Sequence, residues 1–235
     1  MKADLIKLQL NEGAQVSGLF IKPSNARAIF VFAHGAGAGM THPFMEEVAQ
    51  GLAKRRIATL RFNFPFMEMR GDKRWGRPDK AAVAQETVRA ALTEAQKRGA
   101  DLPLFAGGKS FGARMSSQMQ AQEAFPGLRG LIFIGFPLHP AKKPSTARAE
   151  HLERITTPIL FVQGARDALA DLSLFEPVCA AAHAATLHVV EEADHSFHVP
   201  ARLGRKDSEV IAEICEVVAK WVDNLEVLSI GAELE

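Results

Sequence analysis

A chain of 235 residues, of which 47% are hydrophobic and 23% charged, has the composition of a soluble globular protein and can bury a substantial core. Its 28 basic and 27 acidic residues leave a formal charge of +1, which argues against nucleic-acid binding through a basic surface. No apolar run approaches the length of a membrane span, and the charged residues 1–7 differ from a signal peptide. We therefore expect residues 1–235 to form a single domain that contacts neither membranes nor nucleic acid.

The chain begins with two alternating segments, residues 4–10 and 16–21, separated by the turn-like Asn11–Gly13, which predicts an antiparallel hairpin. Residues 28–33 are continuously apolar, as expected of a strand buried on both faces. Strands then alternate with helices, which predicts a mostly parallel sheet with helices on both faces. Further strands are expected at 57–62, 103–106, 130–136, 158–163 and 187–190, and helices at 43–56, 81–98, 113–124, 172–182 and 208–225.

Two cysteines, Cys179 and Cys215, fall in these helical patterns without metal or redox spacing. We interpret them as reduced core residues of a protein in a reducing compartment, the cytoplasm.

The motif Gly108-Lys109-Ser110-Phe111-Gly112 has the form G-x-S-x-G and lies between the strand 103–106 and the helix 113–124. A serine on such a sharp turn projects its hydroxyl away from the sheet, and the flanking glycines let the turn close. The N–H of Phe111, at the start of the helix, would point to where an oxyanion forms. We therefore predict Ser110 as a nucleophile and Phe111 as an oxyanion donor.

Two other interpretations apply to this motif. A phosphate-binding P-loop needs a glycine five residues before Gly108, but Pro103 stands there. An ordinary structural turn with a buried serine remains open when this stretch is considered alone.

A serine nucleophile needs a histidine that takes its proton and an acid that orients the histidine. For a serine on a strand-to-helix turn of an α/β sheet, the acid follows in the chain and then the histidine. Asp167 follows the buried strand 158–163 and is our predicted acid. Asp171 is the substitute, and a helix N-terminal aspartate beside Arg166 is the structural alternative for Asp167.

The histidine is expected after the last strand, where we predict His195 as the base and His198 as its rival. The acidic residues around these histidines could also suggest a metal site. No paired-histidine motif on a helix supports that interpretation, so we assign no metal ligand and no cofactor.

The segment His34-Gly35-Ala36-Gly37 follows a buried strand and matches the second half of an oxyanion hole, where small residues let a backbone N–H approach closely. We predict Ala36 as the second donor, with Gly37 next. A dinucleotide fingerprint is the alternative, but its glycine spacing differs from the one here, and the next strand end carries no acidic residue.

Taken together, strand-HGAGAG, strand-GGKSFGAR, strand-QGARD and the late ADHSF resemble the corresponding segments of α/β-hydrolases over nearly the whole chain. Within that superfamily the chain is most similar to the dienelactone-hydrolase-like group, and to the small set that contains a testis-expressed protein and a subunit of a chromatin acetyltransferase complex. The resemblance implies the α/β-hydrolase fold and the triad Ser110, Asp167 and His195. Dienelactone hydrolases proper use cysteine at the position of Ser110, so their lactone substrate is not carried over.

Only a loop and a short helix fit between Phe136 and Pro158, where a lid domain commonly enters in this superfamily. The resemblance therefore implies an open site without a cap domain. Two basic loops, 68–77 and 139–144, are either solvated or recognise an anionic substrate. We expect the substrate contacts to include Gly37, Lys109 and Phe66.

These features favour a serine hydrolase that acts on small esters or thioesters through an acyl-enzyme. The alternative is an interaction protein that keeps the fold and is catalytically weak or inactive. An interaction protein has no need of a serine, an acid, a histidine and oxyanion donors together, so we expect the enzyme.

Overall fold

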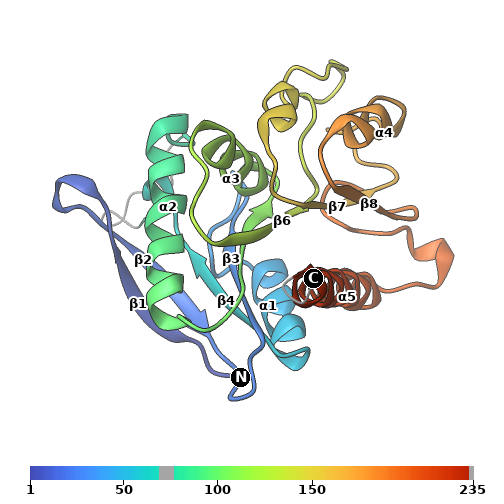
Figure 1. The fold of residues 1–235 in the computed structure, drawn as a ribbon. Helices are drawn as coiled ribbons and strands as arrows, with labels where there is room; N and C mark the ends of the chain where they lie inside the picture. The colour runs from blue at the N-terminus through green and yellow to red at the C-terminus, as the bar shows by residue number, and fades with distance from the viewer. Residues whose placement is uncertain (69–76, 233–235) are drawn as a thin grey trace.

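The computed structural model describes residues 1–68 and 77–232. Within these residues, eight strands form one sheet in the order β1-β2-β4-β3-β5-β6-β7-β8 (Figure 1). The strands are β1 (Asp4–Gln9), β2 (Gln15–Ile21), β3 (Ala28–Ala33), β4 (Ile57–Phe62), β5 (Leu104–Lys109), β6 (Leu128–Ile134), β7 (Ile159–Gly164) and β8 (Ala185–Val190). Strand β2 pairs antiparallel with β1 and β4, and all the other pairs are parallel.

Helices cover both faces of this sheet (Figure 1). The helices α1 (Pro43–Lys54) and α5 (Asp207–Ala232) pack together on one face. The other face carries α2 (Ala81–Arg98), α3 (Phe111–Gln122) and α4 (Leu172–Ala181). The predicted mostly parallel α/β sheet with helices on both faces is therefore confirmed.

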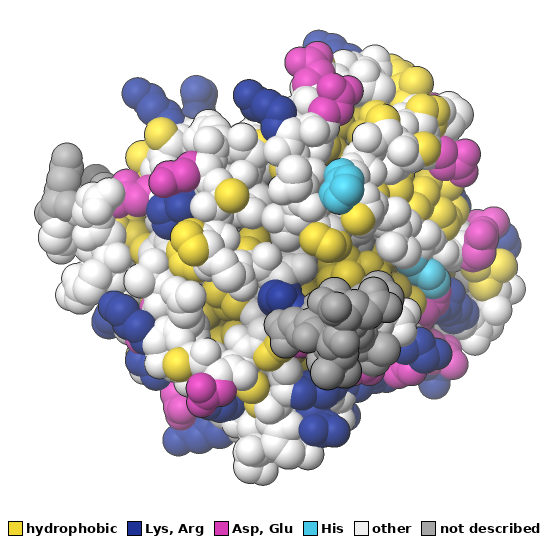
Figure 2. All heavy atoms as spheres, viewed as in Figure 1, with side chains coloured by type: hydrophobic (Ala, Val, Ile, Leu, Met, Phe, Trp, Pro, Cys, Tyr) yellow, Lys and Arg dark blue, Asp and Glu magenta, His cyan; other side chains and the backbone are white. Residues whose placement is uncertain are grey.

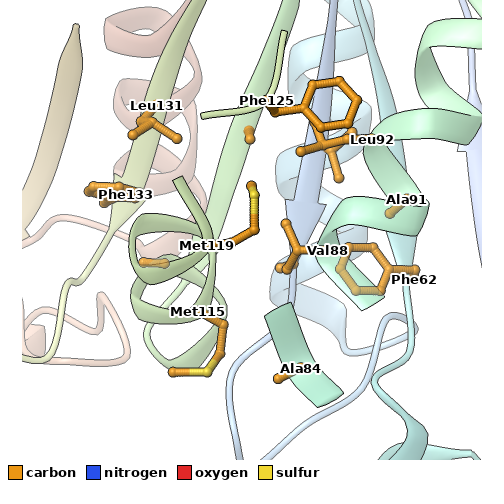
Figure 3. Close-up of a cluster of buried hydrophobic side chains, with 14 of the residues drawn as sticks. Phe62, Ala84, Val88, Ala91, Leu92, Met115, Met119, Phe125, Leu131 and Phe133 are labelled. Atoms are coloured by element: carbon orange, nitrogen blue, oxygen red, sulfur yellow. The ribbon is translucent and has the colours of Figure 1, made fainter. Parts of the chain in front are cut away.

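The core divides into two layers because side chains of a strand alternate between the two faces. In β3, Phe30 and Phe32 face the layer of α1 and α5, whereas Ile29 and Val31 face the layer of α2 and α3. Figure 3 shows part of the second layer, where side chains of α2 and α3 meet those of the sheet. The labelled residues are Phe62, Ala84, Val88, Ala91, Leu92, Met115, Met119, Phe125, Leu131 and Phe133.

Charged side chains of both signs are interspersed over the face seen in Figure 2. This distribution agrees with the formal charge of +1. Within residues 1–68 and 77–232, no helix combines the length and the apolar character needed to cross a membrane.

Some element ends differ from the sequence prediction. Strand β5 continues to Lys109, beyond the predicted end at Ala106, because Gly107 and Gly108 pair with β3 and β6 although they have no side chains to extend the apolar pattern. Helix α3 begins at Phe111 rather than Ala113, directly after the serine. Helix α5 continues past the predicted end at Leu225.

The described segment between β6 and β7 contains a loop and the short 3-10 helix η3 (Glu150–Arg154), and no cap domain enters there. Figure 1 shows this segment between α3 and α4. The carboxyl ends of the parallel strands are therefore not covered by an inserted domain at this point of the chain.

Two glycines of the serine motif lie directly against strand β3: Gly108 at the end of β5 and Gly112 in the first turn of α3. A Cβ atom at Gly112 would lie 2.5 Å from the carbonyl oxygen of Ala33, and one at Gly108 would lie 2.3 Å from the same atom. A side chain at Gly112 would push α3 away from β3, and one at Gly108 would push β5 away from β3. Both glycines are therefore required by close packing.

We expect Gly112→Ala to lower the free energy of unfolding by about 1–3 kcal/mol, because its methyl group would overlap backbone atoms. Urea denaturation followed by circular dichroism measures the change. Gly37→Ala is the matched control, since a Cβ there meets no atom within 4 Å and should leave stability nearly unchanged. Equal stability of the two variants would contradict the packing argument.

Candidate active site

Three polar side chains meet at the carboxyl edge of the sheet, although they come from separate parts of the chain. Ser110 follows β5, Asp167 follows β7, and His195 lies in the loop after β8. The Nε2 atom of His195 is 2.9 Å from Ser110 Oγ, and its Nδ1 atom is 2.7 Å from Asp167 Oδ2. The geometry is a continuous serine–histidine–aspartate chain of hydrogen bonds, formed by the three residues predicted from the sequence.

The backbone of Ser110 adopts a rarely populated conformation, with φ 51° and ψ −109°. Such a conformation costs free energy and persists only where the surrounding packing determines it. Here the contacts of Gly108 and Gly112 with β3 hold the chain on both sides of the serine. The strained turn places the hydroxyl at the edge of the sheet instead of inside it.

The side chain of Asp167 is fully buried and accepts hydrogen bonds from three donors. Besides His195, Gln163 Nε2 donates to its Oδ2 atom at 2.6 Å, and the N–H of Leu169 donates to its Oδ1 atom at 2.8 Å. A carboxylate with this many donors is held in one orientation. Gln163 was not predicted as a site residue; its only signal is its place at the end of β7.

The rival acids of the sequence analysis have other partners. Asp171 accepts hydrogen bonds from the N–H and the hydroxyl of Ser173, so it caps the N-terminus of α4. Asp194 accepts from the N–H groups of Ser196 and His198 and thereby shapes the loop that carries His195. Neither carboxylate is hydrogen-bonded to His195.

The rival base, His198, is exposed and pairs with Asp207 at 2.9 Å. The side chains of Ser110 and Asp167 are both hydrogen-bonded to the ring of His195. Within the described residues, no group of three or more histidine, cysteine, aspartate or glutamate side chains is arranged to hold a metal ion.

His34 holds the loop that follows β3 in place. Its Nε2 atom accepts a hydrogen bond from the N–H of Phe64 at 3.0 Å, and its Nδ1–H donates to the carbonyl oxygen of Gly35 at 2.7 Å. Burial lowers the pKa of His34 from 6.5 to about 4, so the ring is neutral at pH 7 and keeps this tautomer. His34 therefore connects the glycine-rich loop to the segment after β4, a role that the sequence analysis missed.

A second set of contacts fixes the far end of the same loop. The N–H of Met40 donates to Asn63 Oδ1 at 2.9 Å, and the buried Arg61 donates from Nη1 to the carbonyl oxygen of Met40 at 3.0 Å. Arg61 also forms an ion pair with Glu46. The loop between β3 and α1 is thus held at both ends before any ligand binds.

The predicted oxyanion donors lie on either side of the serine. Phe111 is the first residue of α3, where backbone N–H groups have no acceptor within the helix. Ala36 lies in the fixed turn after β3 and lines the pocket that contains Ser110. Small residues in that turn leave its backbone accessible.

A pocket of about 280 Å³ opens at Ser110. Its described lining includes Gly37, whose Cα faces open space, and the aromatic ring of Phe44. The lining residues are Gly35, Ala36, Gly37, Ala38, His42, Phe44, Met45, Lys109, Ser110, His195 and Ser196. The predicted substrate contact Gly37 therefore lies in this pocket.

Phe66 is not part of the described lining of this pocket. Its side chain is buried, and its ring packs against those of His34, Phe64 and Phe111. Phe66 thus packs against Phe111, the residue that follows the serine. Trp75, the other aromatic residue of the predicted loop, lies outside the described residues.

Lys109 lines the pocket, but its ammonium group is directed to the histidine loop. The Nζ atom donates to the carbonyl oxygen of His195 at 2.6 Å and lies 5.4 Å from the ring centre of Phe197. Burial lowers the pKa of Lys109 from 10.5 to about 8, against the opposing charges of Asp167 and Asp194. This hydrogen bond links the backbone of His195 to the end of β5, directly before Ser110.

Comparisons with known proteins identify the fold. Residues 26–223 match the family model of the alpha/beta hydrolase domain. The chain therefore belongs to the α/β-hydrolase family.

Solved structures from several bacteria share this fold. A dienelactone hydrolase from Anabaena variabilis is 16% identical, with a TM-score of 0.73 over 95% of this chain and 97% of that chain. A serine hydrolase homologue from Coxiella burnetii is 19% identical, with a TM-score of 0.71 over 94% and 97% of the two chains. A serine hydrolase without a lid, from Xanthomonas campestris, is also 19% identical, with a TM-score of 0.68 over 94% and 95%.

We expect Asp167→Asn to lower kcat for an activated ester on the order of 10⁴-fold, because an amide cannot hold the same histidine tautomer. Steady-state kinetics with p-nitrophenyl acetate measures the loss, and circular dichroism checks the fold. Asp171→Asn is the matched control and should keep most of the activity, because Asp171 only caps α4. The reverse result would transfer the role of the acid to Asp171.

We expect the kcat/KM of the wild-type protein to fall as the pH rises through about 8, where Lys109 loses its proton and its charge-assisted bond to His195 weakens. Lys109→Met should be roughly tenfold less active at pH 7, since a hydrogen bond to a charged group contributes about 1.5–3 kcal/mol. It should also lack the decline near pH 8. An unchanged alkaline limb in Lys109→Met would rule out Lys109 as its source.

Proposed function

We propose that this protein is a serine hydrolase that cleaves small esters or thioesters through an acyl-enzyme. The observation that carries the proposal is the unbroken hydrogen-bond chain from Ser110 through His195 to the buried Asp167. An interaction protein would gain nothing from a strained serine turn aligned with a histidine.

In the first half of the proposed reaction, His195 Nε2 takes the proton of Ser110 Oγ as this oxygen attacks the carbonyl carbon of the substrate. Asp167 stabilises the imidazolium through its bond to Nδ1–H, and Gln163 and the N–H of Leu169 hold Asp167 in place. The imidazolium then protonates the leaving alcohol or thiol, which leaves the acyl group on Ser110. Water, deprotonated by His195, releases the acid in the second half.

The negative charge that develops on the carbonyl oxygen requires donors that are already oriented. We assign the N–H groups of Phe111 and Ala36 to this task. Phe111 stands at the positive end of α3, and the Ala36 turn is held by His34. Gly37 would lie against the bound substrate.

Similarity to the dienelactone hydrolase and to the lidless serine hydrolase supports this reaction class, and we place the chain in the dienelactone-hydrolase-like group. We also propose that residues 1–235 work as one domain, since the eight strands join in one sheet. Cys179 and Cys215 are both free and buried, which supports a function in the cytoplasm.

Labelling with a fluorophosphonate probe tests the proposal, because such probes react with activated serines. We expect covalent labelling of the wild-type protein and none of Ser110→Ala or His195→Ala, with ester hydrolysis of both variants near background. Ser117→Ala is the control, since Ser117 is buried in α3 and should not contribute to labelling. Absence of labelling in the wild-type protein, or labelling of Ser110→Ala, would overturn the assignment.

The pocket also predicts a preference for short acyl chains. A methylene group contributes about 0.8 kcal/mol only when it is buried, and the described pocket holds about 280 Å³ without an inserted cap domain. We expect kcat/KM to be highest for acetyl to butyryl esters and to fall for octanoyl and longer chains. A series of p-nitrophenyl esters from two to twelve carbons measures this, and a maximum at ten or twelve carbons would contradict the open site.

A further inference from the structure

Two arginines beside the start of α3 have no acidic partner. Arg114 lies in the first turns of α3, and Arg148 lies just before η3; both are partly buried. Neither side chain forms an ion pair or a hydrogen bond with the residues that the structure describes. The Nε atom of Arg114 is inaccessible to solvent and has no acceptor.

The packing of η3 on α3 brings these cations together. Ser117 Oγ and His151 Nε2 are 2.7 Å apart across the contact, and Ala149 and Leu152 are buried in the core beside them. Burial, and next the charge of Arg148, lowers the pKa of Arg114.

The histidine of this contact stays neutral. Burial and then the charges of Arg114 and Arg154 lower the pKa of His151 to about 4. At neutral pH the positive charge of the cluster therefore comes from its arginines.

Two neighbouring guanidinium groups without an acidic partner are unfavourable unless an anion balances their charge. Two like charges repel, and a buried N–H without an acceptor costs free energy on folding. Several other arginines pair with a carboxylate, as Arg61 does with Glu46 and Arg55 with Glu216. A bound anion would satisfy such a buried donor and remove this cost.

We propose that Arg114 and Arg148 form a binding site for a carboxylate or phosphate group of the substrate. A planar guanidinium donates two parallel hydrogen bonds to such an oxyanion, and one anion between two guanidinium groups removes their repulsion. The N-terminal end of α3 adds a favourable partial charge.

The backbone of Arg114 follows the proposed nucleophile by one turn of α3. The N–H of Arg114 donates to the carbonyl oxygen of Ser110 at 3.1 Å, so the two residues are one helical turn, about 6 Å, apart along the axis. The substrate would then be an ester or thioester that carries its anionic group a few bonds from the cleaved carbonyl. This identification of the substrate rests on the proposed function, whereas binding of the anion itself does not.

Isothermal titration calorimetry with succinate and with inorganic phosphate tests binding without catalysis. We expect the wild-type protein to bind at least one of these anions, and Arg114→Gln and Arg148→Gln each to bind it at least tenfold more weakly. Arg202→Gln is the control, because Arg202 is exposed and pairs with Glu192 outside this cluster. The anion that binds more tightly identifies the group as a carboxylate or a phosphate.

No binding of either anion to the wild-type protein, or equal affinities in all variants, would overturn the site. Thermal unfolding monitors the fold of each variant. Arg114→Lys should retain part of the affinity, since it keeps the charge but not the paired donors. If it binds as weakly as Arg114→Gln while remaining folded, the paired donors rather than the charge hold the anion, which supports the same site.

A second measurement ties the site to substrate choice. We would compare kcat/KM for mono-p-nitrophenyl adipate, which carries a carboxylate, with kcat/KM for neutral p-nitrophenyl hexanoate. Arg114→Gln should lose at least ten times more activity on the anionic ester than on the neutral one, and Arg202→Gln should change neither. Equal losses would overturn the role in substrate recognition. If the wild-type protein hydrolyses neither ester, the proposed function fails, and the calorimetry still decides the anion site.

Discussion

The contact of strand β3 with the two glycines of the serine motif is the constraint on which the candidate site depends. Gly108 and Gly112 both lie against the carbonyl of Ala33. The chain therefore changes from strand to helix within the three residues that lie between them. Ser110, in the middle of this turn, has a positive φ and a strained backbone conformation. The hydroxyl thereby reaches His195, and the N–H of Phe111 comes to the free end of α3. Packing in the core and the position of the serine hydroxyl at the edge thus have one cause.

Much of this architecture could be predicted because it follows from local patterns. Continuous apolar strands such as β3 indicate a buried parallel sheet, and in such a sheet the strand ends meet at one edge, which brings together Ser110, Asp167 and His195. The roles of Gln163, His34 and Lys109 could not be predicted in this way. Each depends on a hydrogen bond across the fold, and nothing in the adjacent sequence specifies the partner. The same holds for Arg114 and Arg148, whose side chains form no ion pair within the described residues.

Ser110 has polar neighbours on one side and aromatic neighbours on another. On one side, His195 and Asp167 form a polar network with every carboxylate oxygen occupied. On another, the rings of Phe64, Phe66 and Phe111 pack against one another at the start of α3. A polar network surrounded by apolar groups has stronger hydrogen bonds than the same groups in water. The neutral His34 fits this environment because a charged ring there would be costly.

Strand β8 is at the edge of the sheet, paired only with β7, and most of its residues are partly exposed. The acid and the base of the proposed triad follow these two outermost strands, whereas the serine follows a central one. Edge elements with few buried contacts open more readily than the centre of a sheet. Brief detachment of this edge would separate His195 from Ser110 while the rest of the sheet stayed intact. The proposed triad would then lose its alignment before the sheet unfolds, and activity that depends on it would be confined to a narrower temperature range than the folded state.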